Sequence, residues 1–369
     1  MQALELFNQL TLQRYPLSSD TSLTAFNQAE SILVNRVLTD FANTKLSVIN
    51  ENFGAISCVL QSQIIDQYND SFLSNYGCEL NLQNNHLNSN KPLLLDPSLL
   101  TGDLVIGLLP KSLSFFKWQL EQLSKLNKPV LIAGMVKYIS NGHINLMNQY
   151  FEDTQVSRAE KKARCILLSR PKKQNQNNTL PKHEFNNIEV ENLPGVFCQK
   201  HIDIGARFFI EQFKNIHVNE SFNIADLGCG NGILSLAMAK IHSQNTLNFD
   251  CFDESMQAVK CAEHNWGLNE LDQTKHSVSF IQNDGLLNQA PKKYDIIICN
   301  PPFHQNHTVG IHITQSLIKQ AKVCLKDDGE FWLVANRTLP YLNELKSHFK
   351  LVNQVSQNAK FKVFMVKKS

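Results

Sequence analysis

The chain lacks several features that would assign it to a class at once. None of its nine cysteines forms a CxxC pair, which argues against a zinc or disulfide framework and favours buried, reduced thiols. No apolar run approaches the length of about 18 residues that a membrane-spanning helix needs, and the first residues lack the basic and apolar regions of a secretion signal. We therefore expect a cytoplasmic protein that holds no metal and contacts no membrane.

The chain also lacks a strong excess of charge of either sign. Its net charge of +2 neither requires nor excludes nucleic acid, because a local basic face is compatible with a nearly neutral total. Hydrophobic residues at 43% and charged residues at 18% are typical of a globular protein. At 369 residues the chain exceeds the usual size of a single core, so we expect two domains.

A polar stretch at residues 169–187 separates two halves of the chain. It is rich in Asn, Gln and Lys, contains Pro171 and Pro181, and shows no helical or strand periodicity, which is typical of a linker or a long hairpin loop. We place the boundary near residue 190, which gives domains 1–190 and 191–369.

The second half alternates strand-like apolar runs with helix-like segments. The order is FNIADLG, GILSLAMAKIH, TLNFDCFD, ESMQAVKCAEHNWGLN, VSFIQND, YDIIICN, HITQSLIKQAKVCL and GEFWLVAN. This alternation predicts a parallel sheet with helices on both faces, which is a doubly wound α/β domain.

The first half follows the same order in a weaker form, at residues 46–57, 103–115 and 128–139. NENFG contains one glycine where the second half has three, and GLLPK stands in place of NPPF. We therefore expect a duplicated domain whose first copy has lost the chemistry.

A glycine loop, DLGCGNGIL, joins the first strand of the second half to its helix. Gly228, Gly230 and Gly232 allow a tight turn and the close approach of a ligand, but their spacing differs from GxGxxG and no Walker lysine follows. The pattern DxGxGxG is the loop used for S-adenosylmethionine, whose amino and sulfonium groups are cationic. Asp226, before the first glycine, suits such a cation.

Two further acids end the next two strands. Asp253 closes NFDCFD, where a carboxylate can accept both hydroxyls of a ribose at the carboxyl edge of the sheet, and Asp284 in FIQNDG can accept an adenine amino group. A single aspartate in such a place is more often a cap or a turn residue, but three in succession favour a cofactor site. Asp250 points to the opposite face, and we expect a structural role for it.

The motif NPPF follows the fourth strand at the same edge. The side-chain oxygen of Asn300 and the carbonyl of Pro301 provide two acceptors for the exocyclic amine of a base, so that its lone pair faces a methyl carbon. The two prolines, Pro301 and Pro302, end the strand and hold the carbonyl outward, and the ring of Phe303 offers a face on which a base can stack.

Methyl transfer from a sulfonium needs little acid or base assistance, and we find neither a catalytic triad nor a metal site in the sequence. His304 and His307 lie near the motif but are more often turn or surface residues than ligands. His201 is ambiguous in the same way. Arg207 can reach the carboxylate of the cofactor, but an ion pair on a surface helix is an equal alternative.

These motifs together resemble a known family. DLGCGNG, FDES, ND and NPPFH, after GVFCQKHIDIGARFF, resemble the ribosomal RNA guanine-N2 methyltransferases. LTLQRYP, INENFGAIS and VANRTLPYLNELK are most similar to the large subunit methyltransferase G (RlmG) family, with the small subunit methyltransferase C (RsmC) family as its sister.

The resemblance covers nearly the whole chain and implies two tandem Rossmann-like methyltransferase domains, the first degenerate and helping to hold RNA. It implies transfer of a methyl group from S-adenosylmethionine to N2 of a guanine in 23S rRNA, free or within an assembling ribosomal particle. It places Asn300, Pro301 and Phe303 in the base pocket and the loop glycines with the three acids at the cofactor.

Other interpretations remain open from the residues alone. NPP followed by an aromatic residue also occurs in enzymes that methylate adenine in DNA or glutamine in release factors, but the first half matches neither architecture. A 16S rRNA enzyme of the sister family, or an RNA-binding assembly factor with a vestigial cofactor site, is the remaining alternative. Basic clusters at residues 158–164 and 170–173 are candidates for phosphate contacts, although such runs are usually solvated faces.

Overall fold

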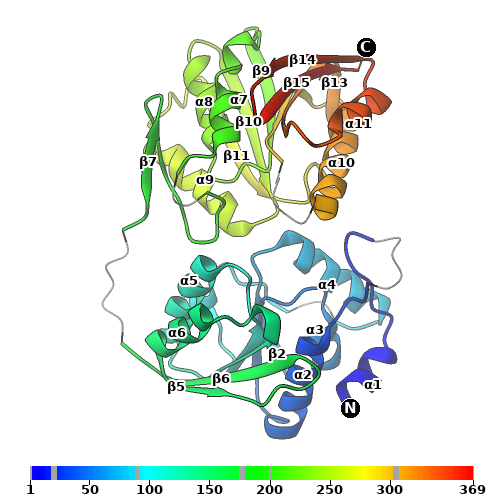
Figure 1. Cartoon of the computed structure of the whole chain (residues 1–369), viewed down its shortest axis with the longest axis vertical. Helices are drawn as coiled ribbons and strands as arrows, with labels where there is room; N and C mark the ends of the chain where they lie inside the picture. Colours follow the sequence, from blue (N-terminus) through cyan, green and yellow to red (C-terminus); the bar gives the residue numbers. More distant parts are fainter. Residues whose placement is uncertain are drawn as a thin grey trace. The chain divides into compact units, whose positions relative to one another are not determined.

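The chain folds into two compact units. The computed structural model describes residues 2–17, 23–88, 91–173, 179–198, 201–301 and 307–368, without the side chains of residues 307–311. Unit 1 is Met1–Asn178 and unit 2 is Thr179–Ser369. Each unit is a sheet flanked by helices (Figure 1). The boundary expected near residue 190 falls inside a strand of unit 2, because a hairpin that precedes the second sheet packs with that unit.

Unit 1 is built on a six-stranded sheet. In order of pairing, its strands are β2 (Ile64–Tyr68), β1 (Leu46–Ile49), β3 (Leu104–Leu108), β4 (Val130–Met135), β6 (Ala163–Pro171) and β5 (Phe151–Val156). Its helices are α1 (Gln2–Asn8), α2 (Gln28–Asp40), α3 (Ala55–Val59), α4 (Phe72–Asn84), α5 (Leu113–Ser124) and α6 (Asn141–Tyr150), with short 3-10 turns at Pro97–Leu99 and Val136–Tyr138.

Unit 2 is built on a seven-stranded sheet. In order of pairing, its strands are β11 (His276–Gln282), β10 (Thr246–Asp253), β9 (Ser221–Leu227), β12 (Tyr294–Cys299), β13 (Leu325–Asn336), β15 (Phe361–Lys367) and β14 (Leu351–Gln357). Its helices are α7 (Ile204–Ile210), α8 (Ile233–Ile241), α9 (Met256–Leu268), α10 (His307–Cys324) and α11 (Tyr341–His348), with a 3-10 turn at Phe213–Asn215.

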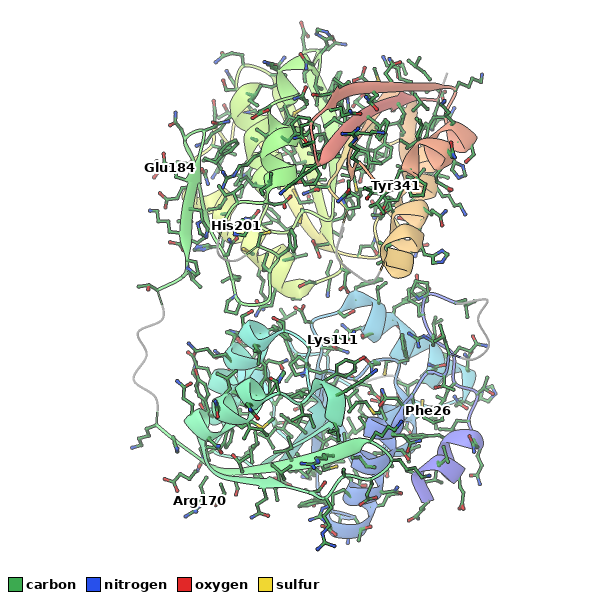
Figure 2. The ribbon with its side chains drawn as sticks, viewed as in Figure 1. Phe26, Lys111, Arg170, Glu184, His201 and Tyr341 are labelled. Carbon is green, nitrogen blue, oxygen red and sulfur yellow. The ribbon has the colours of Figure 1, made fainter. Side chains whose placement is uncertain are left out.

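Alternating side chains of the central strands of unit 2 form two separate cores. Ile296 and Ile298 of β12 pack on the face covered by α7 and α8, whereas Ile297 and Cys299 pack on the face covered by α10 and α11. Tyr341 lies at the start of α11 (Figure 2). It is buried in the second core, where its hydroxyl accepts a hydrogen bond from Thr314. Burial on both faces explains why these strands are continuously apolar in sequence.

The two sheets have the same strand order. β2, β1, β3 and β4 of unit 1 take the places of β10, β9, β12 and β13, and the antiparallel pair β6–β5 takes the place of β15–β14. In the described part of unit 1 no strand corresponds to β11, and only a single bridge between Gln67 and Leu93 lies along that edge. The duplication predicted from the order of elements is therefore confirmed, with the outermost strand missing from the first copy.

Two parts of the chain differ from the sequence prediction. The stretch at residues 169–187, interpreted as a linker or a long hairpin loop, contains the end of β6 and the strand β7 (Lys182–Phe185), which pairs with β8 (Ile188–Glu191). The missed signal is the pair Asn186 and Asn187, whose positive φ angles of 50° and 60° form a tight two-residue turn. The strands β14 and β15 are antiparallel, so the second sheet is mixed rather than wholly parallel.

No helix among the described residues is both long and apolar enough to cross a membrane.

Candidate functional site

Four neighbouring strands of unit 2 end at one edge of the sheet. Their order is β11, β10, β9 and β12, and all three pairings are parallel. Leu227 at the end of β9 pairs with Phe252 on one side and with Cys299 on the other. The acids predicted for the cofactor and the first residue of NPPF therefore lie at the carboxyl ends of adjacent strands, where ligands bind in open α/β sheets.

The glycine loop has two kinds of glycine. All three have positive φ, at 71° for Gly228, 57° for Gly230 and 80° for Gly232. A Cβ added to Gly228 or Gly230 would meet no atom within 4 Å, whereas one added to Gly232 would lie 3.1 Å from the Cα of Ala262 in α9. The first two glycines therefore face open space, and the third allows α8 and α9 to pack closely.

Asp253 connects the end of β10 to this loop. Its Oδ2 accepts a hydrogen bond from the backbone N–H of Gly230 at 3.0 Å, and its Oδ1 accepts one from Ser255 at 3.0 Å. The backbone carbonyl of Asp253 also accepts from Asn283 at 2.9 Å, which holds the turn containing Asp284 beside it. Asp284 is partly exposed and precedes Gly285, which has a φ of 54°.

Asp226 lies beneath the loop rather than on its surface. Its side chain is fully buried, and its Oδ2 accepts a hydrogen bond from Ser235 Oγ at 2.6 Å. Burial raises the pKa of this carboxyl to about 7. Its Oδ1 has no hydrogen-bond partner in the described structure, so one acceptor remains for a ligand donor or cation near the loop.

Asn300 follows β12 and is held by a residue that the sequence analysis did not single out. Its Nδ2 donates a hydrogen bond to Asp203 Oδ2 at 3.1 Å, while its Oδ1 is buried without a partner in the described structure. Pro301 is buried at the end of the strand. Pro302 and Phe303, predicted to complete the base pocket, lie outside the described residues.

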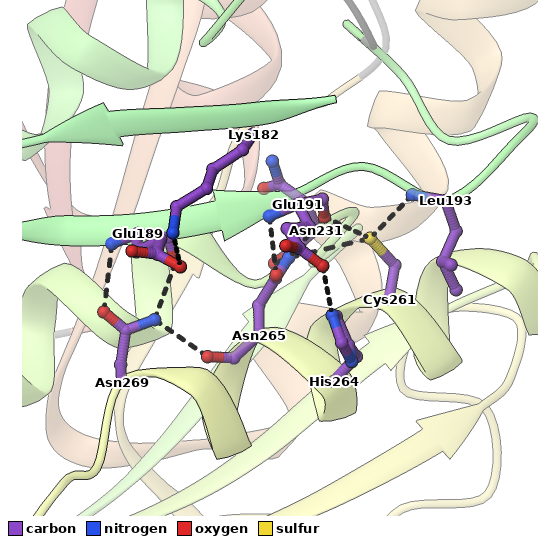
Figure 3. A network of polar contacts seen from close by, with 9 residues as sticks. All are labelled: Lys182, Glu189, Glu191, Leu193, Asn231, Cys261, His264, Asn265 and Asn269. Atoms are coloured by element: carbon purple, nitrogen blue, oxygen red, sulfur yellow. Dashed lines mark hydrogen bonds and ion pairs between the residues drawn. The ribbon is translucent and has the colours of Figure 1, made fainter. Parts of the chain in front are cut away.

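Asn265 of α9 and Asn269, the residue that caps the end of α9, hold the strand β8 in place (Figure 3). Asn265 accepts from the N–H of Glu191 and donates to its carbonyl, at 2.8 and 3.0 Å, and Asn269 makes the same pair of bonds to Glu189. Asn265 Nδ2 also donates to the carbonyl of Asn231 at 2.9 Å, inside the glycine loop. We call Asn265 and Asn269 the asparagine clamp.

The loop residue Asn231 is held from a second side. Its Nδ2 donates to Oδ1 of Asn192 at 2.8 Å, and Asn192 is fully buried. The sequence analysis did not identify these asparagines, because an amide that binds backbone groups of a distant segment leaves no local pattern. Their repetition in NWGLN and in the corresponding helix of the first half was the available signal.

Unit 1 repeats the asparagine clamp. Asn81 of α4 accepts from the N–H of Gln13 and donates to its carbonyl and to that of Phe53, at 2.8, 2.7 and 2.7 Å. Asn85 makes the same pair of bonds to Thr11. The two units therefore share one supporting network beneath the loop that follows the first strand of the sheet.

The remaining candidates lie on the surface or fulfil structural roles. His201 is exposed, and the guanidinium of Arg207 is exposed and lies 5.9 Å from the ring centre of Phe185. Asp250 accepts hydrogen bonds from Lys293 and Tyr294, which fits the structural role expected for it. No group of three metal-ligating side chains is present within the described ranges, and His304 lies outside them.

Comparison with known proteins identifies both units. Residues 187–365 match the family model of the methyltransferase small domain, and residues 1–175 match that of the RLMG N-terminal domain. The ribosomal RNA large subunit methyltransferase G of Psychromonas ingrahamii is 32% identical, over 98% of this chain and 97% of the relative. That of Vibrio vulnificus is 34% identical, over 99% of both chains. This chain belongs to the ribosomal RNA large subunit methyltransferase G family.

Solved structures support the fold of this RlmG family member. The T. thermophilus 16S rRNA N2 methyltransferase (RsmC), solved in complex with AdoMet and guanosine, aligns with a TM-score of 0.74 at 19% identity. The alignment covers 98% of this chain and 95% of that protein. The tandem Rossmann-like architecture predicted from sequence is therefore confirmed.

Proposed function

We propose that this chain transfers a methyl group from S-adenosylmethionine to the exocyclic N2 of a guanine in 23S rRNA. Membership of the RlmG family makes the chain an S-adenosylmethionine-dependent rRNA methyltransferase. The finer assignment, to 23S rRNA and to N2, rests on the name of the family and on the chemistry of the carboxyl edge of unit 2. The RsmC enzyme, an N2 methyltransferase solved with guanosine, supports the choice of atom.

The residues of the glycine loop fit the cofactor. Gly228 and Gly230 leave open space where any other residue would place a Cβ, and the unpartnered Oδ1 of Asp226 is an acceptor beneath it. We assign Asp253 to the ribose hydroxyls, because a carboxylate accepts about four hydrogen bonds in total, and Asp284 to the adenine amino group. When bound, the cofactor supplies a methyl group attached to a sulfonium. The leaving group of the transfer is then a neutral thioether, and its departure needs no metal.

Asn300 and Pro301 hold the base amine. The lone pair of an exocyclic amine is delocalised into its ring, so acceptors that fix its N–H groups also aim its lone pair. The Oδ1 of Asn300, buried and without a partner among the described residues, is the observation that carries this proposal, since such an atom in a native site calls for a partner. We propose that the base pocket consists of Asn300, Pro301, Pro302 and Phe303, with the ring of Phe303 as the face on which the base stacks.

Unit 1 has lost the groups that this chemistry needs. Ile49 pairs with Gly107 as Leu227 pairs with Cys299, so Leu108 stands where unit 2 has Asn300. Asn69 follows β2 where Asp253 ends β10, and its side chain donates to the carbonyl of Glu51 instead of accepting from the loop. We therefore propose that unit 1 binds RNA and supports the fold without catalysing a reaction.

The carboxyl edge of unit 1 has an exposed aromatic residue between cations. Tyr138 is 49% exposed, and the ammonium of Lys137 lies 4.7 Å from the centre of its ring. Lys137 and Lys111 lower the pKa of the Tyr138 hydroxyl, so both cations are near it. An aromatic face beside lysines fits a stacked base with its phosphates, and we propose these three residues as RNA contacts.

Incubation with methyl-labelled cofactor tests the function. Separated 23S rRNA, 16S rRNA, DNA and protein fractions are offered to the enzyme, and labelled material is digested to nucleosides or amino acids. We expect N2-methylguanosine from 23S rRNA. Label in 16S rRNA would favour the sister activity, and label in DNA or protein would overturn the proposal.

The variant Asn300→Ala is the control for chemistry. We expect it to keep the cofactor affinity of the wild type in calorimetry while its turnover falls by about a hundredfold or more, the usual cost of losing one aligned polar group. RNA binding without any transfer by the wild type would favour the assembly factor with a vestigial cofactor site.

A further inference from the structure

One carboxylate oxygen of Asp203, Oδ2, contacts two groups at once. Oδ2 accepts a hydrogen bond from the backbone N–H of Ala206 at 2.9 Å, which caps α7, and another from Nδ2 of Asn300 at 3.1 Å. Asp203 and Asn300 are 97 residues apart and come from different elements. The contact therefore ties the end of β12 to the start of the helix that precedes the second sheet.

This contact decides which way the Asn300 amide faces. An amide presents a donor on one side and an acceptor on the other, whereas an ionised carboxylate only accepts. Nδ2 must therefore face Asp203, and Oδ1 must face away from it. This Oδ1 is the buried acceptor to which the base amine was assigned above, and it has no partner in the part of the chain that the structure describes.

We propose that Asp203 is a positioning residue for methyl transfer. It fixes the amide of Asn300 with its oxygen toward the target amine, and its negative charge polarises the amide so that the oxygen accepts more strongly. The inference rests on the proposed function, because it concerns the same base amine. It adds a residue that touches neither the substrate nor the cofactor.

A purely structural role is the competing explanation, since Asp203 also caps a helix. Serine caps helices about as well as aspartate, so Asp203→Ser keeps the bond to Ala206. The serine side chain is shorter and uncharged, and its hydroxyl can donate as well as accept, so it no longer forces Nδ2 of Asn300 to face position 203. Asp203→Ser therefore separates positioning from capping.

The test compares single-turnover rates at saturating cofactor and RNA. We expect Asp203→Ser to lower the rate by about a hundredfold, the scale for a displaced catalytic group. Thermal stability and cofactor affinity should stay near those of the wild type. A wild-type rate in Asp203→Ser, or a rate that falls only in step with stability, would overturn the inference.

A charge-swapped pair supplies the decisive readout. In Asp203→Asn combined with Asn300→Asp, an amide at position 203 donates to a carboxylate at position 300, both of whose oxygens are acceptors. We expect this double variant to be at least about tenfold faster than Asn300→Asp alone, which sets two carboxylates against each other. A double variant no faster than Asn300→Asp would contradict the proposal.

Asp96→Ser is the matched control. Asp96 also caps a helical turn through its carboxylate, with the N–H of Ser98 at 2.7 Å, but it lies in unit 1. We expect a wild-type rate from it. Identification of the labelled nucleoside tests the proposed function, while the relative rates test Asp203 on whichever base amine takes the label.

A further measurement does not depend on turnover. It is the rate at which the side-chain amide protons of Asn300 exchange with solvent, followed by NMR. Faster exchange in Asp203→Ser supports the inference even where the substrate assignment fails, and unchanged exchange contradicts it.

Discussion

At the scale of single residues, the properties of this protein depend on polar atoms that folding removes from water. The Asp226 carboxyl is fully buried, with Ser235 as its partner on one oxygen and none in the described structure on the other. Such a group is costly to ionise without a ligand, which explains why its pKa rises from 3.8 to about 7. Glu51 in unit 1 is also buried, and burial raises its pKa from 4.5 to about 7.

The raised pKa of Asp226 predicts a pH dependence of stability. The folded protein keeps its proton at pH values where the unfolded chain has lost it, so the contribution of this group to stability is full below about pH 3.8 and is lost as the pH rises to about 7. Each tenfold difference in proton affinity between the folded and unfolded states corresponds to about 1.4 kcal/mol in the free energy of unfolding. We expect Asp226→Asn to flatten the fall in unfolding temperature between roughly pH 5 and pH 7, measured without cofactor. An unchanged slope would show that Asp226 ionises freely in the fold.

At the scale of elements, the asparagine clamp connects a strand that precedes the second sheet to the glycine loop. Asn265 holds Glu191 of β8 and the carbonyl of Asn231 through one amide (Figure 3). Asn81 holds Gln13 and the carbonyl of Phe53 in the same way in unit 1. The same support therefore lies under the glycine loop of unit 2 and under the corresponding loop of unit 1, which gives an internal control.

We expect Asn265→Ala and Asn81→Ala to lower stability similarly, by about 1–3 kcal/mol, since each leaves buried backbone groups unpaired. Only Asn265→Ala should weaken cofactor binding, because only the loop that Asn265 supports carries Gly228 and Gly230. We expect a loss of about tenfold in affinity, which corresponds to about 1.4 kcal/mol of binding free energy. Calorimetry with S-adenosylmethionine and thermal unfolding of both variants measure the two effects. Equal cofactor affinities would mean that the clamp does not set the shape of the loop.

At the scale of the whole molecule, we propose that the duplication divides labour between two units of one fold. Two surfaces of unit 1 are candidates for the proposed RNA contact. One is the edge with Lys111, Lys137 and Tyr138, and the other is formed by the basic clusters of the sequence analysis. Within those clusters Arg170 pairs with Asp153 and Glu152, and Arg164 is partly buried. Lys161, Lys162, Lys172 and Lys173 are exposed.

We expect alanine at Lys111, Lys137 and Tyr138 to weaken RNA binding and to reduce the salt slope by roughly one to two, one for each lost phosphate contact. The matched variant with alanine at Lys161, Lys162, Lys172 and Lys173 tests the other surface. Titration at several salt concentrations measures both. Unchanged affinity and slope in one variant would remove its surface from the RNA contact, and unchanged values in both would place RNA on unit 2 alone.

The sequence by itself determined the order of elements and the edge at which the site lies. Continuous apolar runs such as YDIIIC predict buried parallel strands, and β12 and β10 occur within the residues expected for them. Asp253 and Asn300 could be assigned to one edge because parallel strands end together. These conclusions depend on local periodicity and on general rules of connection, which a sequence carries without coordinates.

Only the tertiary structure decided how these groups are held. The contact of Asp203 with Asn300 joins residues 97 apart, and the asparagine clamp joins amides to backbone atoms of a distant segment. Backbone groups are the same at every position, so no residue type marks the partner of such an amide. The burial of Asp226 likewise follows from how α8 covers β9. Packing therefore fixed the orientation of the Asn300 amide, whereas the pattern of residues fixed only its place.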